Sequence, residues 1–297
     1  MDNGVRDQNS YMTIKKLTND ITQRLQPLYD PREAAAVAYV YVCAKLGMRR
    51  HEIVLRGDES LDDSLLADIQ RDMENLTEGC PVQYVLGETE FYGLPFKVSP
   101  AVLIPRPETE ELVQMVAQRY AGKHVKIWDV GTGSGCIAVT LAKLLPDAAV
   151  FATDISEEAL AVARRNAALN RVEVTFARHD MADAENLPFG ESRFGIIVSN
   201  PPYIPASDRA AMHMNVTDYE PGIALFVPDN DTLWCYDALA RLGQRVLVPG
   251  GRIYVETYHD FHDELTTLFI EQGFSDVHSI KDLNGRPRFV EARYNIE

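Results

Sequence analysis

The chain has 297 residues, of which 46% are hydrophobic and 25% are charged, as in an ordinary globular protein. It contains no apolar run of about 18 residues, so we expect no transmembrane helix. The formal net charge is −15, whereas proteins that grip nucleic acid by its phosphates normally carry a basic surface, so nucleic acid is disfavoured as the main partner.

The N-terminal stretch MDNGVRDQNSYMTIKK has neither an apolar core nor a small-residue cleavage site. We therefore expect no signal peptide and a cytoplasmic protein. The four cysteines are far apart and form no C-x-x-C pair: Cys43, Cys80, Cys136 and Cys235. Free structural thiols and no metal site are expected, and a monomer is the simplest assembly.

The first part of the chain has helical periodicity. Three segments, 11–29, 31–47 and 61–79, place apolar residues at helical spacing. Asp30 is a candidate N-cap before Pro31, and Gly47 ends the second segment. Residues 1–80 are therefore predicted to form a small all-α domain.

Residues 81–104 differ in character. Two runs rich in β-forming residues, 83–86 and 90–98, predict a β-hairpin that links the helical domain to the remainder of the chain.

From residue 105 to 297 strands and helices alternate. Strands are expected at 125–130, 148–155, 172–180, 194–200, 249–258 and 287–294. Helices are expected at 108–122, 134–145, 156–170, 232–247 and 264–274. This alternation predicts an α/β domain with a mostly parallel sheet and helices on both faces.

A glycine loop comes directly after the first of these strands. The sequence from Asp129 to Gly135 reads DVGTGSG, which is G-x-G-x-G and not the G-x-G-x-x-G of a pyrophosphate site. Glycines allow a tight turn and close approach of a ligand, although a plain strand-to-helix turn would use them too. The expected cofactor contacts here are Asp129, Gly131, Thr132, Gly133 and Gly135.

Asp154 ends the next strand, where a carboxylate can accept hydrogen bonds from ribose hydroxyls. Ser156 can cap the next helix, which frees Asp154 for a ligand. Asp180 ends the third strand, where it could meet an adenine amino group or cap a loop. Dinucleotides and S-adenosylmethionine both fit such a site, and the loop pattern favours S-adenosylmethionine.

The fourth strand leads into Asn200-Pro201-Pro202-Tyr203. The prolines restrict the backbone and have no N–H groups. The Asn200 side-chain oxygen and the Pro201 carbonyl could accept both hydrogens of a planar –NH2 group, with Tyr203 against its plane. This arrangement directs the nitrogen lone pair toward a methyl donor and favours the charge that develops on nitrogen. A simple Pro-Pro turn is the alternative.

These residues belong to a pattern that runs through nearly the whole chain and resembles the HemK/PrmC protein-(glutamine-N5) methyltransferases. The matching segments are PREA at 31–34, residues 81–113 with LIPRPETE, DVGTGSGCIAV at 129–139, ATDIS at 152–156, VSNPPYI at 198–204, YEPGIALF at 219–226, PGG at 249–251 and DLNGRPR at 282–288. Near residue 256 the family usually has small residues after the glutamate, whereas this chain has Thr257-Tyr258-His259-Asp260, and Tyr258 and His259 are expected to be surface or packing residues.

The resemblance implies a Rossmann-like class I methyltransferase domain with a seven-stranded sheet, preceded by a helical domain that contacts a release factor. It implies that Asn200, Pro201, Pro202 and Tyr203 hold the glutamine of the GGQ motif in peptide-chain release factors. It also implies that the 131–135 loop, Asp154 and Asn200 contact S-adenosylmethionine. Arg106 and the acidic residues Glu108 and Glu110 either gate this site or only begin a helix.

Three other functions remain open. The substrate could be a glutamine of a ribosomal protein, since related enzymes share the same motifs. It could be an adenine amino group flipped out of a nucleic acid, although the charge opposes this. The chain could also be a scaffold that binds cofactor without catalysis, which the intact Asn200 disfavours.

Overall fold

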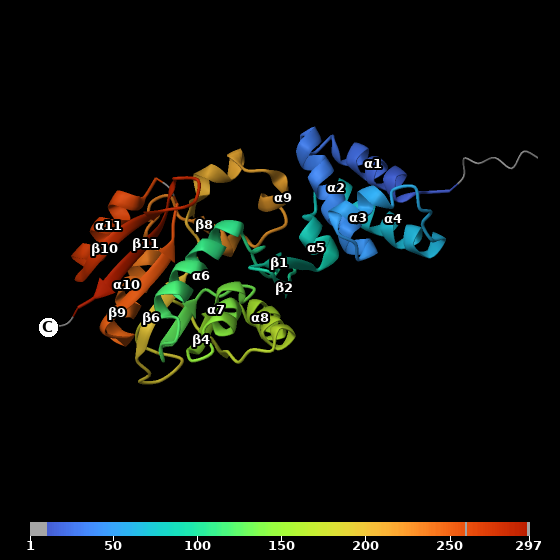
Figure 1. The fold of residues 1–297 in the computed structure, drawn as a ribbon. Coiled ribbons are helices and arrows are strands. Elements are labelled where there is room, and N and C mark those ends of the chain that lie inside the picture. The colour runs from blue at the N-terminus through green and yellow to red at the C-terminus, as the bar shows by residue number, and fades with distance from the viewer. Residues whose placement is uncertain (1–10, 259, 296–297) are drawn as a thin grey trace, which may run out of the picture. The chain divides into compact units, whose positions relative to one another are not determined.

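The computed structural model describes residues 11–258 and 260–295, and it divides into two compact units between Leu86 and Gly87 (Figure 1). Within the described residues no helix is long and apolar enough to cross a bilayer. All four cysteines are free thiols.

The first unit is all-helical, as its periodicity predicts. Its helices are α1 (Ile14–Leu25), α2 (Pro31–Leu46), α3 (Arg50–Leu55), α4 (Asp63–Thr77) and α5 (Val82–Leu86). Asp30 caps α2 as predicted, since its carboxylate accepts from the N–H groups of Arg32 and Glu33. Gly47 ends the same helix in the left-handed conformation, with φ of 62°. The apolar faces of these helices enclose a separate core around Ile21, Leu25 and Tyr41.

The β-run predicted at 83–86 is wrong, because these residues belong to α5. The N–H groups of Tyr84 and Val85 both donate to the carbonyl of Pro81, which closes a helical turn. Valine and tyrosine favour strands, but their β propensity depends strongly on context. The predicted hairpin exists, but it is formed around the second run alone: β1 (Glu88–Phe91), which begins two residues before that run, and β2 (Leu94–Lys97) pair antiparallel.

The second unit contains a seven-stranded sheet in the order β10-β11-β9-β6-β3-β4-β5. Its strands are β3 (Lys126–Val130), β4 (Ala149–Asp154), β5 (Thr175–Arg178), β6 (Phe194–Ser199), β9 (Leu247–Glu256), β10 (Phe274–Lys281) and β11 (Pro287–Tyr294). Five neighbouring strands of the sheet are parallel to one another: β9, β6, β3, β4 and β5. The strand β11 runs antiparallel to both of its neighbours, β9 and β10. The predicted mostly parallel α/β sheet is confirmed.

The strand β10 is not among the predicted strands. The sequence places its first residue, Phe274, in the preceding helix, but that helix ends at Glu271 and Gly273 turns the chain with φ of 80°. Most side chains of β10 are half-exposed or exposed, and its register with β11 is interrupted twice. An edge strand of this kind lacks the apolar alternation that identifies a buried strand.

Helices cover both faces of the sheet. They are α6 (Pro107–Tyr120), α7 (Cys136–Leu144), α8 (Glu157–Asn170), α10 (Trp234–Val246) and α11 (His262–Glu271). Neighbouring strand residues face opposite ways: Ile127 and Ile196 pack in the core with α6, α7 and α8, and Trp128 and Ile197 pack in the core with α10 and α11. Because both faces of the sheet are buried, the sequences of these strands are continuous apolar runs and do not alternate between apolar and polar residues.

The order in which strands are added to the sheet reverses beside β3, because β4 and β5 lie on one side of it and β6 lies on the other. In open parallel sheets, ligands bind beyond the carboxyl ends of the strands at such a switch point. The segment after β6 makes short elements before α10: β7 (Ile204–Pro205), η1 (Ala206–Ala211), α9 (Met214–Thr217), η2 (Gly222–Ala224) and β8 (Phe226–Val227). The sheet thus places the glycine loop and residues Asn200 to Tyr203, which we call the NPPY turn, at the same edge.

Candidate active site

A cleft of about 360 Å³ lies at the carboxyl ends of the central strands. It brings together many of the residues that the sequence singles out: Gly131, Thr132, Gly133, Asp154, Asp180, Asn200 and Pro202. These residues come from the loops after four different strands, so only the folded sheet assembles them. Asp129, Gly135, Pro201 and Tyr203 do not line the cleft, and each has a different position.

The glycine loop is held against the end of β4. The N–H groups of Gly131 and Thr132 both donate to the carbonyl of Thr153, at 2.9 and 2.8 Å. Gly131 and Gly133 have φ of 73° and 55°, in the left-handed region that favours glycine. The loop therefore presents its backbone to the cleft in a conformation that side chains would strain.

Asp154 sits where β4 ends. Its two carboxylate oxygens accept from the N–H groups of Gly133 and Ser156, at 2.8 and 2.9 Å. Burial raises the pKa of Asp154, and these backbone hydrogen bonds oppose that rise. Ser156 caps α8 by accepting from the Ala159 N–H, as predicted. Asp154 therefore links the loop to the helix and lines the cleft at the same time.

Asp129 is fully buried and braces the loop from behind. Its Oδ2 atom accepts from the Thr132 hydroxyl at 2.6 Å and from the Ala138 N–H at 3.1 Å. Its Oδ1 atom has no hydrogen-bond partner among the described residues. Burial raises the pKa of Asp129 to about 7, and the nearby Asp154 adds to the rise.

Gly135 packs against a helix. It precedes α7 with φ of 81°, and an added Cβ would lie 3.0 Å from the Cβ and 3.2 Å from the Cα of Ala163 in α8.

Asp180 does line the cleft, and its Oδ1 atom also accepts from the Ala182 N–H at 2.9 Å. Both alternatives for Asp180, ligand contact and loop cap, are therefore compatible with its position.

Replacement by alanine should cost different amounts of stability at two glycines of the loop. Gly135→Ala combines left-handed strain with a clash against α8, so we expect it to lower the free energy of unfolding by about 2–4 kcal/mol. Gly133→Ala meets no protein atom within 4 Å, so its cost to folding is the strain of about 1–2 kcal/mol. Urea denaturation of both variants measures the difference, and equal losses would contradict it.

The NPPY turn leaves β6 and divides into two parts. Asn200 and Pro202 line the cleft, whereas Pro201 is buried. The Asn200 Nδ2 atom donates to the Thr109 hydroxyl at 3.1 Å. The Tyr203 hydroxyl donates to Glu256 Oε1 at 3.1 Å, and burial together with this carboxylate raises the pKa of Tyr203 far above its usual value. The side chains of the turn are thus fixed by α6 and β9.

The PRPETE segment, Pro105 to Glu110, borders the cleft and begins α6. Arg106 lines the cleft and forms an ion pair with Glu220, whose buried carboxylate also accepts from the Ile104 N–H. Glu108 and Glu110 lie in the first turn of α6, where acidic residues favour a helix. The pair between Arg106 and Glu220 joins two segments that border the cleft.

Other contacts at the site lie outside the sequence predictions. His179 lines the cleft, is 8% exposed, and has no hydrogen-bond partner for Nε2 among the described residues; burial lowers its pKa. Asn166 is fully buried and donates to the carbonyls of Ser134 and Lys97, which ties the glycine loop to the hairpin. Single asparagines and histidines carry no local sequence signal of such roles.

The divergent segment after Glu256 contributes packing. Tyr258 lies with its ring centroid 6.2 Å from that of Tyr203, and its hydroxyl donates to Asp208. This agrees with the expected packing role of Tyr258. The prediction for His259 falls outside the described residues.

Comparison with known proteins agrees with this architecture. Residues 107–217 match the family model of the methyltransferase small domain, and residues 16–87 match that of the PrmC N-terminal domain. A methyltransferase from Pyrococcus furiosus superposes with a TM-score of 0.51 at 17% identity, covering 79% of this chain and all of that one. The 16S rRNA N2 G1207 methyltransferase of Thermus thermophilus, solved with AdoMet and guanosine, has a TM-score of 0.50 at 18% identity, with 70% and 50% covered.

The fold and the cleft define a Rossmann-like class I methyltransferase. The release factor glutamine methyltransferase of Flavobacterium psychrophilum is 40% identical over 95% of this chain and 100% of its own length. That of Bacteroides thetaiotaomicron is 42% identical, over 94% of this chain and 99% of its own. The chain belongs to the release factor glutamine methyltransferase family.

Proposed function

We propose that this chain transfers the methyl group of S-adenosylmethionine to the side-chain nitrogen, N5, of the glutamine in the GGQ motif of peptide-chain release factors. The observation that carries the proposal is the meeting of two elements in one cleft. The glycine loop with Asp154 borders the same space as Asn200 and Pro202 of the NPPY turn. Family membership at 40% identity over almost the whole chain supports the choice of substrate.

The residues of the cleft fit S-adenosylmethionine. Asp154 is free to accept from ribose hydroxyls with the lone pairs that its two backbone donors leave. The buried Nε2 atom of His179, which lacks a partner among the described residues, and the carboxylate of Asp180 are available to an adenine ring. The Gly131–Gly133 backbone would lie against the methionyl part, with Asp129 and Gly135 supporting it. When bound, this cofactor supplies an activated methyl group on a sulfonium.

The NPPY turn would hold the acceptor. In this proposal the side-chain oxygen of Asn200, which lines the cleft, accepts one hydrogen of the glutamine amide. The Pro201 carbonyl, next to the lining residues Asn200 and Pro202, accepts the other hydrogen, Tyr203 lies against the amide plane, and Pro202 stiffens the turn. An amide nitrogen is a poor nucleophile because its lone pair is delocalised. Acceptors on both hydrogens favour the positive charge that develops on nitrogen as the new bond forms. No strong base is required before attack, because the nitrogen becomes acidic only once it carries the methyl group, and it then releases one proton to water.

We also propose that the helical unit contributes to recognition of the release factor, with residues 1–80 as the recognition domain, 81–104 as the linker and 105–297 as the catalytic domain. We expect a monomer, which is the simplest assembly for this chemistry.

Mapping the methyl group tests the function. The chain is incubated with labelled cofactor and either release factor, ribosomes or DNA. We expect label on the GGQ glutamine and none on a release factor carrying Gln→Ala at that position. Faster labelling of a ribosomal protein would show that the substrate is a ribosomal glutamine and not the release factor. Salt-sensitive methyl transfer to adenine would show that the chain is a nucleic-acid methyltransferase.

A further inference from the structure

A buried carboxylate connects the side chains of the NPPY turn to two other elements. Glu256, the last residue of β9, is 1% exposed. Its Oε1 atom accepts from the Tyr203 hydroxyl at 3.1 Å, and its Oε2 atom accepts from the Thr109 hydroxyl at 2.7 Å. Thr109 lies in the first turn of α6, is 1% exposed, and accepts from Asn200 Nδ2 at 3.1 Å.

The order of donors in this chain of hydrogen bonds is set by the groups themselves. Burial raises the pKa of Glu256, whereas the hydrogen bonds from Thr109 and Tyr203 and the nearby Arg288 favour its ionised form. An ionised carboxylate only accepts, so the single hydroxyl hydrogen of Thr109 is directed at Glu256. The Thr109 oxygen can then only accept from Asn200. Asn200 must therefore turn its –NH2 group toward Thr109, which leaves its carbonyl oxygen as the group available to the cleft that it lines.

We propose that Glu256 and Thr109 are positioning residues that set the orientation of the Asn200 amide. They make Asn200 offer an acceptor, and not a donor, to an incoming –NH2 group. The inference rests on the proposed function, which requires an acceptor at this place. With the amide reversed, two –NH2 groups would face each other and the substrate would lose a hydrogen bond.

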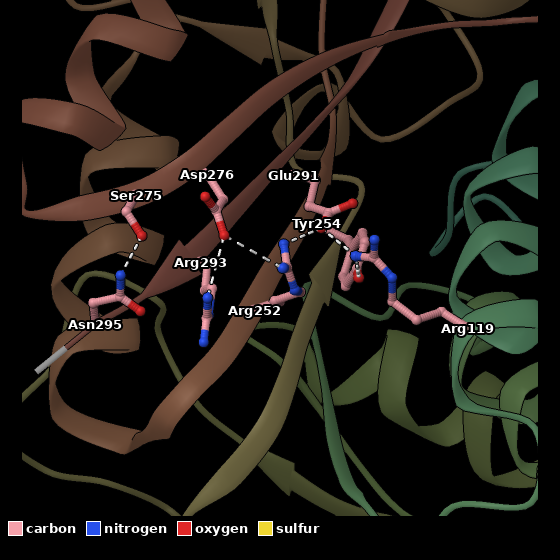
Figure 2. Close-up of polar contacts among 8 residues, drawn as sticks. All are labelled: Arg119, Arg252, Tyr254, Ser275, Asp276, Glu291, Arg293 and Asn295. Carbon is pink, nitrogen blue, oxygen red and sulfur yellow. Dashed lines mark hydrogen bonds and ion pairs between the residues drawn. The ribbon is translucent and has the colours of Figure 1, made fainter.

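The elements that carry these two residues are also joined at a second place, on the far part of α6 (Figure 2). Arg119 donates to the Tyr254 hydroxyl at 2.7 Å and pairs with Glu291, which Arg252 also contacts. Arg119 is ten residues after Thr109, about 15 Å along the helix, and Tyr254 is two residues before Glu256. Two attachments between α6 and β9 leave Thr109 and Glu256 little freedom to separate.

Three substitutions separate positioning from packing. Thr109→Val keeps the shape and removes the hydroxyl, whereas Thr109→Ser keeps the hydroxyl. Glu256→Gln can donate to Thr109, which would turn the Thr109 hydroxyl toward Asn200 and reverse the amide. We expect Thr109→Val and Glu256→Gln to lower kcat about 10- to 100-fold, as outer hydrogen-bond partners of an active site do.

The same variants should leave the Kd for S-adenosylmethionine within about threefold of the wild-type value, and Thr109→Ser should keep kcat within about threefold. Adding Thr109→Val to Asn200→Ala should lower kcat no further, because the effect passes through Asn200. A Thr109→Val enzyme with kcat within twofold of wild type overturns the proposal, as does a Thr109→Ser enzyme as slow as Thr109→Val.

Calorimetric unfolding of each variant shows whether it folds. If Thr109→Val does not fold, the kcat of Glu256→Gln tests the proposal in its place. The rate at which the wild-type enzyme methylates release factor tests the proposed function itself. The ratio of variant to wild-type rates, on whichever –NH2 substrate is accepted, tests the positioning.

Discussion

Replacement of Asn200 by alanine should lower kcat for release-factor methylation by about 10²–10³-fold, the cost of losing one preorganised polar group at the reacting centre. The variant loses the side-chain oxygen that accepts from the substrate amide and the –NH2 group that contacts Thr109. Asn200 lines the cleft, so a smaller weakening of cofactor binding, about two- to fivefold, is also expected. Single-turnover kinetics with saturating cofactor measure the chemical step.

Asn186→Ala is the matched control. Asn186 is an exposed asparagine whose side chain donates a hydrogen bond to Asp183, and it is not among the residues that line the cleft. It should retain wild-type kcat and cofactor affinity. If Asn200→Ala kept kcat within twofold of wild type, the NPPY turn would not be the acceptor site, and a role as a scaffold would become the better account of the protein.

The parts of this site that the sequence predicts are those governed by local rules. Glycines that come directly after a buried strand indicate a turn needing left-handed φ, and Gly131 and Gly133 have it. Asp154 is predicted from its place at the end of a strand, because parallel strands end at a common edge. Ser156 and Asp30 are recognisable as caps because capping needs only a short polar side chain before a helix.

The parts that the sequence does not predict depend on contacts between distant residues. Thr109 and Glu256 are separated by 147 positions, and each has an ordinary local explanation, as a residue in a first helical turn and as the end of a strand. Asn166 likewise reaches the hairpin 69 positions away. In α5 and β10 local propensity and the burial pattern point the wrong way, because tertiary contacts decide those segments.

Replacement of Asp154 by asparagine should raise the Kd for S-adenosylhomocysteine about 10- to 100-fold. Hydrogen bonds to a charged group contribute about 1.5–3 kcal/mol, and the amide both loses the charge and offers only one accepting atom. The variant must also leave either the Gly133 or the Ser156 N–H without its acceptor, so some loss of stability accompanies the change. Isothermal titration calorimetry measures affinity, and thermal unfolding without ligand measures the structural part.

The 2′-deoxy analogue of S-adenosylhomocysteine separates ribose recognition from damage to the loop. If Asp154 accepts from the ribose hydroxyls, wild-type protein should bind the analogue more weakly than the parent, and Asp154→Asn should largely abolish that difference. Asp180→Asn, at the neighbouring strand end, is the matched control and should weaken both ligands by the same factor. Equal weakening of both ligands by Asp154→Asn would mean that this carboxylate acts only through Gly133 and Ser156, and the ribose would then have to be held by another group of the cleft.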